Sequence, residues 1–109
     1  MRDDSLYLRH ILDSIERIES YASVGRERFL SESHWQDAII RQLEVIGEAS
    51  KQLSAELKAA NPEVPWRRIA GLRDVLIHQY FGVDLEVVWG VVQKDLPLLK
   101  GKVAEIIGR

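Results

Sequence analysis

The segment 31–57, "SESHWQDAIIRQLEVIGEASKQLSAEL", contains the longest apolar pattern of the chain. Its apolar residues recur at intervals of three and four, the spacing that places side chains on one face of an α-helix. Ser31 can act as the N-cap, and "NPEVP" at residues 61–65 would end the helix. The segment therefore predicts one helix of about seven turns. Its apolar positions are Trp35, Ala38, Ile39, Leu43, Ile46, Ala49, Leu53 and Leu57.

A similar pattern precedes this segment, from Leu8 to Ala22, with possible N-caps at residues 3–5 and a stop at Gly25. A third helix is expected to open at Pro65 and run to Gly82, because proline is favoured in a first turn and glycine after a last one. The repeated three-four spacing predicts that helices dominate the chain.

The C-terminal part predicts a fourth helix, capped by Asp84 and carrying "LEVVWGVVQK". Asp95 and Pro97 favour a fresh helix start for "LPLLKGKVAEIIGR", because proline disrupts a helix interior. The alternative is a kinked continuation of the fourth helix. Strand signals are weak, so the expected fold is an all-α, up-and-down bundle of four or five helices in a single domain, residues 1–109.

Composition limits the function classes. Fifteen Lys and Arg stand against seventeen Asp and Glu, so no global positive field would recruit nucleic acid or membrane, and any anion site must be local. The chain has no cysteine and no long apolar run, and acidic residues stand where a signal peptide would be basic. We expect a cytoplasmic protein without a membrane span.

The polar residues of "GLRDVLIHQYFG", residues 71–82, interrupt an otherwise apolar stretch. On a regular helix Arg73 lies about 40° from Ile69, at the edge of the expected core stripe, whereas His78 lies about 180° from it. Arg73 and His78 are thus about 140° apart and cannot readily serve one site within one chain. Either the helix loosens before Gly82, or two copies of the chain share a cleft.

A structural interpretation of the same residues is open. An arginine is most often half of an ion pair, a lone histidine near a helix end is often a surface residue, and Tyr80 would be a core aromatic with a hydrated hydroxyl.

The segment "RDVLIHQY" matches the pattern R-x4-H-x-Y, and with its flanks "RQLEVIGEASKQLS" and "VVWGVVQKDLPLLK" the chain resembles the HepT-like toxins of the HEPN superfamily over nearly its whole length. The resemblance implies a small helical bundle that forms a homodimer, with the motifs of both subunits in one cleft. It also implies a metal-independent ribonuclease that acts on RNA, with tRNA as one candidate. Such a ribonuclease is the toxin of a type VII toxin–antitoxin pair.

The resemblance further implies that a minimal nucleotidyltransferase antitoxin silences the toxin by transferring AMP to the motif tyrosine. Matched residue by residue, Arg73 and His78 become the catalytic pair and Tyr80 the site of AMPylation. Many relatives have Asn after the motif arginine, where this chain has Asp74. An acidic group there would either orient His78 or weaken RNA binding.

Residues outside the motif are candidates for RNA binding, metal binding or helix packing. Arg67 and Arg68 would extend a basic rim for RNA, or simply be a solvated helix start. Trp66 is expected in the core or at an interface, with base stacking as the alternative. His10 and His34 have no partners at metal-ligand spacing, so no metal and no cofactor is expected. A glycine inside a helix costs about 1 kcal/mol, so we expect Gly47 or Gly71 to lie at a tight packing contact.

A second function from another class fits the same residues. The bundle could be a non-catalytic adaptor, or a nucleotide-binding module, that docks a nucleotidyltransferase, with the motif only holding the interface together.

Overall fold

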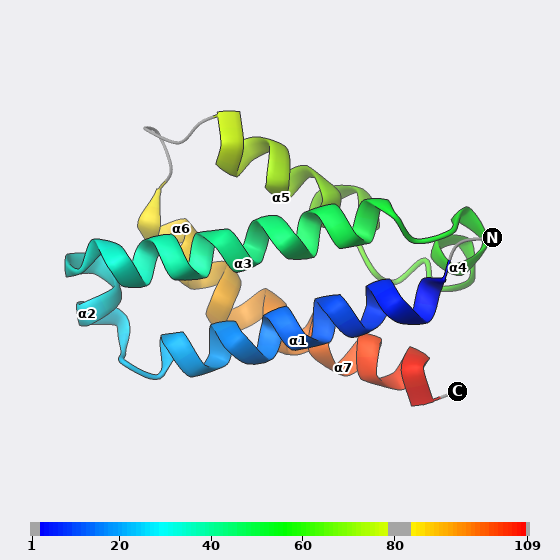
Figure 1. Cartoon of the computed structure of the whole chain (residues 1–109), viewed down its shortest axis with the longest axis horizontal. Coiled ribbons are helices and arrows are strands. Elements are labelled where there is room, and N and C mark those ends of the chain that lie inside the picture. Colours follow the sequence, from blue (N-terminus) through cyan, green and yellow to red (C-terminus); the bar gives the residue numbers. More distant parts are fainter. Residues whose placement is uncertain (1–2, 79–83, 109) are drawn as a thin grey trace.

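The chain folds into an antiparallel bundle in which four longer helices follow one another up and down (Figure 1). The computed structural model describes residues 3–78 and 84–108, and the side chains of residues 73–78 lie outside that description. Every regular element in the described part is helical, which confirms the all-α bundle. The four longer helices are α1 (Asp4–Ala22), α3 (Ser33–Lys51), α5 (Trp66–His78) and α7 (Leu96–Gly108).

Shorter elements connect them. They are α2 (Arg26–Ser31), α4 (Ala55–Ala60), α6 (Leu85–Gly90) and the π-helical segment η2 (Val91–Asp95). Both chain ends lie at one end of the molecule and α2 at the other (Figure 1).

The core lies where α3 packs between α1 and α5, with α7 lying along α1. The apolar stripe expected from Leu8 onward is buried at most of its positions, and the stripe of the central segment meets it. Branched side chains fill this contact without leaving any exposed surface on Ile11, Ile15, Ile18, Ile39 and Ile46. Burying a side chain of this size contributes about 1.5–3 kcal/mol, so this contact is the main source of stability.

The predicted helix over residues 31–57 is wrong at its C-terminal end, because α3 ends at Lys51 and a separate helix, α4, begins at Ala55. Ser54 caps the new helix α4 by accepting a hydrogen bond from the Leu57 N–H at 3.1 Å. Asp4 of α1 reinforces the break, accepting from the Ser54 N–H at 2.8 Å and from its hydroxyl at 2.6 Å. Ser54 is thus a local N-cap of α4, and its contact with a carboxylate fifty residues earlier in the chain is the part that no local pattern could reveal.

The N-cap assigned to Ser31 is also wrong. Ser31 ends the unpredicted helix α2, and its hydroxyl donates to the Glu27 carbonyl at 2.9 Å. The chain turns into α2 at Gly25, whose φ of 97° lies in the region that side-chain-bearing residues rarely adopt. Glu32 then occupies the junction between α2 and α3.

The chain stays helical from Leu85 to Gly108, so the C-terminal segment is a continuation rather than a new helix. The Leu96 N–H bonds to the Val91 carbonyl, five residues back, as in a π-helix. Pro97 explains the π-helical turn before it. In a regular α-helix the proline ring would clash with the carbonyl four residues earlier, and proline has no N–H to donate. Asp84 caps α6 as predicted, accepting from the Glu86 N–H at 2.9 Å.

None of the helices in the described part of the chain combines the length and the apolar character needed to cross a bilayer.

Candidate functional site

The helix that carries the motif, α5, is anchored at its N-terminal end. Trp66 is buried, with 8% of its surface exposed, and its indole N–H donates to the Asn61 carbonyl at 3.0 Å. Asn61 is itself buried and donates to the Leu57 carbonyl at 2.9 Å. Trp66 is thus a core residue, as expected, and not a surface for base stacking.

The two arginines that follow Trp66 have different surroundings. Arg68 reaches Asp95 of η2, with 3.6 Å between Nη2 and Oδ2. Arg67 is exposed and has no ion pair or hydrogen bond within the described part of the chain. Eleven residues separate Arg67 from His78, which puts their positions about 20° apart around the helix, whereas the position of Arg68 is about 80° from that of His78. Arg67 is therefore the better placed of the two for an anionic ligand of the motif.

The motif itself falls at the C-terminal end of α5. The backbone stays α-helical from Arg73 through Asp74 to His78, while the side chains of these three residues lie outside the described part. Tyr80 lies outside the described residues altogether. Because the helix does not loosen before His78, Arg73 and His78 keep a separation of about 140°. The structure therefore does not bring Arg73 and His78 together by local unwinding.

The helix α6, the next described element, contacts α2 through two pairs of side chains. Glu86 forms an ion pair with Arg26, and the rings of Phe29 and Trp89 lie 5.3 Å apart. The C-terminal end of α5 and the start of α6 both lie toward the α2 end of the bundle (Figure 1). The contacts with α2 therefore fix α6 at the end of the molecule toward which α5 runs.

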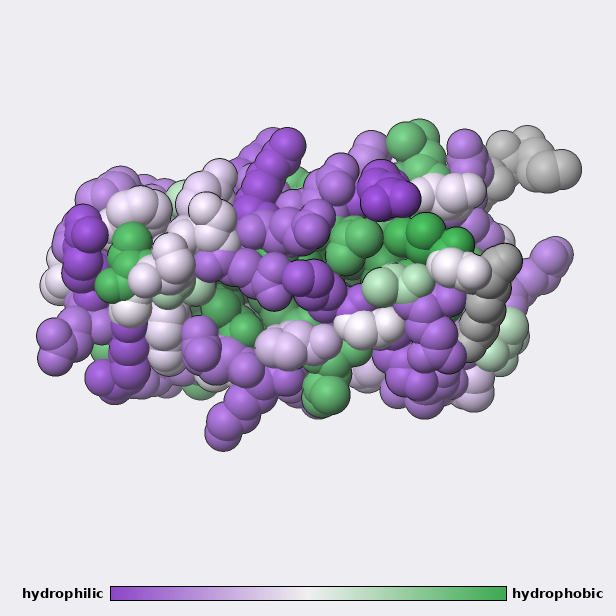
Figure 2. All heavy atoms as spheres, turned by 90° about the horizontal axis from the view of Figure 1, so that it is seen from below, coloured by the Kyte–Doolittle hydropathy of each residue, from purple (hydrophilic) through white to green (hydrophobic). Residues whose placement is uncertain are grey.

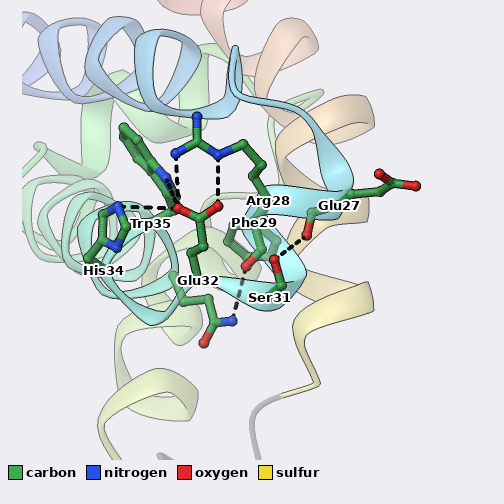
Figure 3. Close-up of polar contacts among 8 residues, drawn as sticks. Glu27, Arg28, Phe29, Ser31, Glu32, His34 and Trp35 are labelled. Carbon is green, nitrogen blue, oxygen red and sulfur yellow. Dashed lines mark hydrogen bonds and ion pairs between the residues drawn. The ribbon is translucent and has the colours of Figure 1, made fainter.

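A polar cluster at the same end surrounds Glu32, at the junction of α2 and α3 (Figure 3). Arg28 donates to both carboxylate oxygens, at 2.7 Å through Nε and 3.0 Å through Nη2. The Trp35 indole N–H donates to the same carboxylate at 3.2 Å, and His34 Nε2 lies 3.7 Å from it. The Arg28 guanidinium also lies over the Trp35 ring, 5.7 Å from its centroid.

The cluster shifts the pKa values of its charged pair. Hydrogen bonds from Arg28 lower the pKa of the Glu32 carboxyl, and the same bonds raise the pKa of Arg28. This cluster was not predicted from the sequence. The signal was the four-residue spacing of Arg28 and Glu32, which favours an ion pair on a helix, but α2 itself was not predicted.

Hollows open on the described surface on two sides of α3, against α1 and beside α5. One lies between α1 and α3, measures about 390 Å³, and brings together Tyr7, His10, Arg41 and Glu44. Arg41 and Glu44 lie 3.7 Å apart, so this hollow offers both signs of charge rather than a basic track. The other hollow, about 340 Å³, lies between α5 and α7 and is mainly apolar.

The glycine expectation is resolved only for Gly71. A Cβ built on Gly71 meets no atom within 4 Å, so Gly71 is not at a tight packing contact, whereas Gly47 is buried in α3. No group of three His, Asp or Glu side chains in the described residues is placed to hold a metal ion.

Comparison with known proteins identifies the family. The family model described as "Ribonuclease HepT-like" matches residues 11–106. The chain belongs to the HepT-like ribonuclease family. It is 50% identical over 97 residues to a protein of Thermococcus cleftensis described as "Probable ribonuclease HepT", covering 88% of each chain. No solved structure matches the chain.

Two further relatives of this HepT-like chain differ in how much of their own length the match covers. A "Putative RNase" of Caldanaerobacter subterraneus subsp. tengcongensis is 41% identical over 108 residues, covering 98% of this chain and 96% of its own. A protein of Methanocaldococcus jannaschii described as "Gamma-glutamylcyclotransferase and putative RNase" is 46% identical over 107 residues, 97% of this chain. The matched region is only 48% of that longer protein.

Proposed function

We propose that this HepT-like chain is the toxin of a toxin–antitoxin pair and acts as a metal-independent endoribonuclease on RNA, including tRNA. The observation that carries the proposal is the motif R-x4-H-x-Y, at residues 73–80, on a chain that the family model matches over residues 11–106. Its partners are a second copy of the chain and a minimal nucleotidyltransferase antitoxin.

The chemistry needs no metal because RNA carries its own nucleophile. The 2′-hydroxyl attacks the adjacent phosphorus, its proton passes to the neutral His78 of one subunit, and the bond from phosphorus to the 5′-oxygen breaks. The protonated His78 of the second subunit gives its proton to that leaving oxygen. Arg73 holds the phosphate through its forked donors and stabilises the charge that develops on it. The products are a 2′,3′-cyclic phosphate and a 5′-hydroxyl.

The regular course of α5 supports a shared cleft. Two groups about 140° apart on one helix are brought to one phosphate more readily from two helices than from one. Arg67, which lies on the helical face of His78 and has no charged partner in the described part, extends this face for the RNA backbone. Asp74 follows Arg73 directly and either orients His78 or tunes the strength of RNA binding.

The regulation proposed for this chain, on its resemblance to HepT-like toxins, acts through Tyr80. Its hydroxyl would attack the α-phosphorus of ATP on the antitoxin and release pyrophosphate. Tyr80 lies seven residues after Arg73, which is nearly the same helical face if the helix continues. The added AMP brings a phosphodiester charge that competes with RNA for Arg73.

The proposal is tested by incubating the antitoxin-free protein with total RNA and purified tRNA in EDTA and analysing the new ends. We expect 2′,3′-cyclic phosphates. Cleavage that requires an added divalent ion would contradict the metal-free mechanism. Absence of any cleavage, with Tyr80 unmodified, would favour the non-catalytic adaptor.

Two matched variants test the RNA path. Arg67→Ala should weaken RNA binding and reduce its dependence on salt, because one phosphate contact is lost. Arg68→Ala should have a smaller effect, because Arg68 is paired with Asp95. Equal effects from both variants would mean that the face of His78 is not the RNA path.

The regulatory step is tested by intact mass. Protein co-produced with the antitoxin should gain one or more adenylyl units, and Tyr80→Phe should gain none at the motif. An unchanged gain in Tyr80→Phe would place the modification elsewhere.

A further inference from the structure

One face of α5 carries a glycine that the fold of its own chain does not require. Gly71 lies inside the helix, where glycine is a poorer helix former than any residue except proline. Its backbone is α-helical, and Gly25 is the only glycine with a positive φ among the described residues. A Cβ built on Gly71 would meet no atom of the described residues within 4 Å. Neither backbone conformation nor packing within the chain therefore explains this glycine.

A glycine of this kind is by itself no sign of a ligand, because α7 has one as well. A Cβ on Gly101 would also meet no atom of the described part within 4 Å. The lysines on either side of Gly101 are paired, since Lys100 donates to Glu19 at 2.8 Å and Lys102 donates to Glu63 at 3.3 Å. Figure 2 looks onto the side of α1 and α7 and shows a band of apolar side chains with hydrophilic ones on both sides. Both cations beside Gly101 thus already face carboxylates.

Gly71 differs because a cation without a partner shares its face of α5. Arg67 is exposed and forms no ion pair or hydrogen bond among the described residues. It precedes Gly71 by four residues, which puts the two positions about 40° apart around the helix. Gly71 in turn lies about 20° from His78 and about 10 Å before it along the helix axis. Arg67, Gly71 and His78 therefore follow one another along a single face.

This face points away from the core of the bundle. Ile69 is buried and lines the hollow between α5 and α7, and its position is about 160° from that of Gly71 around α5. Leu72, which lines the same hollow, is about 100° from Gly71. The face that carries Arg67 and Gly71 is therefore separate from the apolar hollow.

We propose that an RNA strand on its way to His78 passes close to the backbone of α5 at Gly71, and that this glycine determines how tightly RNA beyond the cut site is bound. The inference rests on the proposed function. A side chain at position 71 would stand between Arg67 and His78 and hold the sugar–phosphate chain away from the helix. Gly71 is thus a residue that makes room for substrate and takes no part in the proton transfers.

The spacing along the helix gives the length of RNA involved. Arg67 lies about 16 Å before His78 along the axis, and successive nucleotides of a stacked strand rise by roughly 3.4 Å. Arg67 would therefore contact a phosphate several nucleotides away from the one that is cut. Such a contact positions the strand and carries no base recognition of its own.

The chemistry of the face fits a nucleic-acid backbone better than a protein segment. Arg67 offers a positive charge for which no described carboxylate competes, and Gly71 offers bare backbone without an apolar side chain to bury. A protein partner would instead need apolar anchors. Asp74 also lies on this face, four residues before His78, which is the spacing at which two side chains of a helix interact. We therefore assign Asp74 to His78 and the segment from Arg67 to Gly71 to the RNA strand.

Binding of RNA without cleavage tests the proposal. The probe is a fluorescent 2′-O-methyl RNA oligonucleotide longer than the span from Arg67 to His78, which cannot be cut because its nucleophile is blocked. Gly71→Leu should raise its dissociation constant about tenfold, measured by fluorescence anisotropy, and Gly71→Ala should raise it by less. Gly101→Leu is the matched control, a leucine at an exposed helical glycine, and should bind as wild type does. Equal affinities for Gly71→Leu and Gly101→Leu would overturn the proposal.

A double variant tests the reason for the loss. If leucine at position 71 acts by lifting the strand off Arg67, then Arg67→Ala should weaken binding in wild type and cost little more in Gly71→Leu. Losses that add in the double variant would mean that the two residues act independently, and would overturn the shared path.

Stability and assembly separate a blocked path from a damaged fold. Gly71→Leu and Gly101→Leu should unfold at urea concentrations no lower than wild type, because leucine is the better helix former. Gly71→Ala adds only a methyl group to open space and keeps the test valid if the leucine variant does not fold. Sedimentation velocity should give wild type and Gly71→Leu the same oligomeric state. A Gly71→Leu variant that binds RNA poorly only because it loses a second copy would place protein on this face and overturn the proposal.

RNA cleavage separates this proposal from the proposed function. If wild type cuts RNA, and Gly71→Leu binds and cuts RNA as well as wild type does, the nuclease stands and the path at Gly71 is rejected. If wild type cuts no RNA but binds the probe, and Gly71→Leu weakens that binding, the path stands and the nuclease is rejected. If wild type neither cuts RNA nor binds the probe, both are rejected.

Discussion

Apolar side chains lie both in the contact between α1 and α3 and around the hollow between α5 and α7, but only the first contact is closed to solvent. In the first, Ile15 and its neighbours have no exposed surface and the helices meet directly. In the second, apolar residues line an open hollow, Leu98 at its edge is exposed, and ion pairs between Arg68 and Asp95 and between Lys102 and Glu63 lie beside it. Closed packing of apolar side chains is therefore concentrated between α1 and α3, and the apolar side chains between α5 and α7 are less completely covered.

The largest effect should come from cutting into the closed contact. Ile15→Ala should lower the free energy of unfolding by about 2–5 kcal/mol, because it leaves a cavity in a fully buried site. Leu98→Ala should change it by about 0.5 kcal/mol or less, measured by urea denaturation under conditions that keep the protein monomeric. Similar losses of unfolding free energy in both variants would show that the two regions do not differ in their contribution to stability. Ile15→Val, expected to cost about 0.5–1.5 kcal/mol, serves if Ile15→Ala does not fold.

A smaller effect is expected where α1 is tied to the break before α4. Ser54→Ala removes the cap of α4 and the bond from its hydroxyl to Asp4, and should cost about 1–2 kcal/mol. Ser33→Ala is the matched control, at an exposed position at the start of α3. If Ser54→Ala cost no more than Ser33→Ala in urea denaturation, the tie between Asp4 and Ser54 would not contribute to stability.

The face of α5 that carries Gly71 should accept a larger side chain. Gly71→Ala should stabilise the monomer by about 0.5–1 kcal/mol, because the added methyl group meets no atom and alanine is the better helix former. Thermal and urea unfolding would measure the change. A loss of stability would show that this face is packed after all.

The smallest effect concerns the cluster at the α2–α3 junction. Because the pKa of Glu32 is lowered in the folded protein, its contribution to stability is present above its unfolded pKa and is lost as pH falls through the folded pKa. Glu32→Gln should therefore be less stable than wild type at neutral pH, with the difference shrinking in acid. A difference that stays constant with pH would contradict the assignment.

The sequence predicted the features that depend on local spacing. The stripe from Leu8 to Ile18 and the cap at Asp84 follow from periodicity and capping rules and are found, and the helix predicted to open at Pro65 begins one residue later, at Trp66. The features that it did not predict depend on distant partners. The contact of Ser54 with Asp4 joins residues fifty positions apart, and the difference between Arg67 and Arg68 depends on Asp95.

The candidate site divides in the same way. The pattern alone named Arg73, His78 and Tyr80, and the family comparison supports the class of chemistry. The pattern could not show that α5 stays helical through His78, nor that the groove beside it is apolar and open, because both depend on packing between helices far apart in sequence.

The most direct test of the account is RNA cleavage in EDTA by wild type, His78→Ala and His10→Ala, with equal folding of the three checked by circular dichroism. His10 is the matched control, an exposed histidine on α1 whose ring lies edge-on to Tyr7. The account predicts cleavage by wild type and His10→Ala at similar rates and a loss of about a hundredfold or more in His78→Ala, the usual scale of a missing acid or base. Undiminished cleavage by His78→Ala would contradict the central claim that this histidine performs the proton transfers.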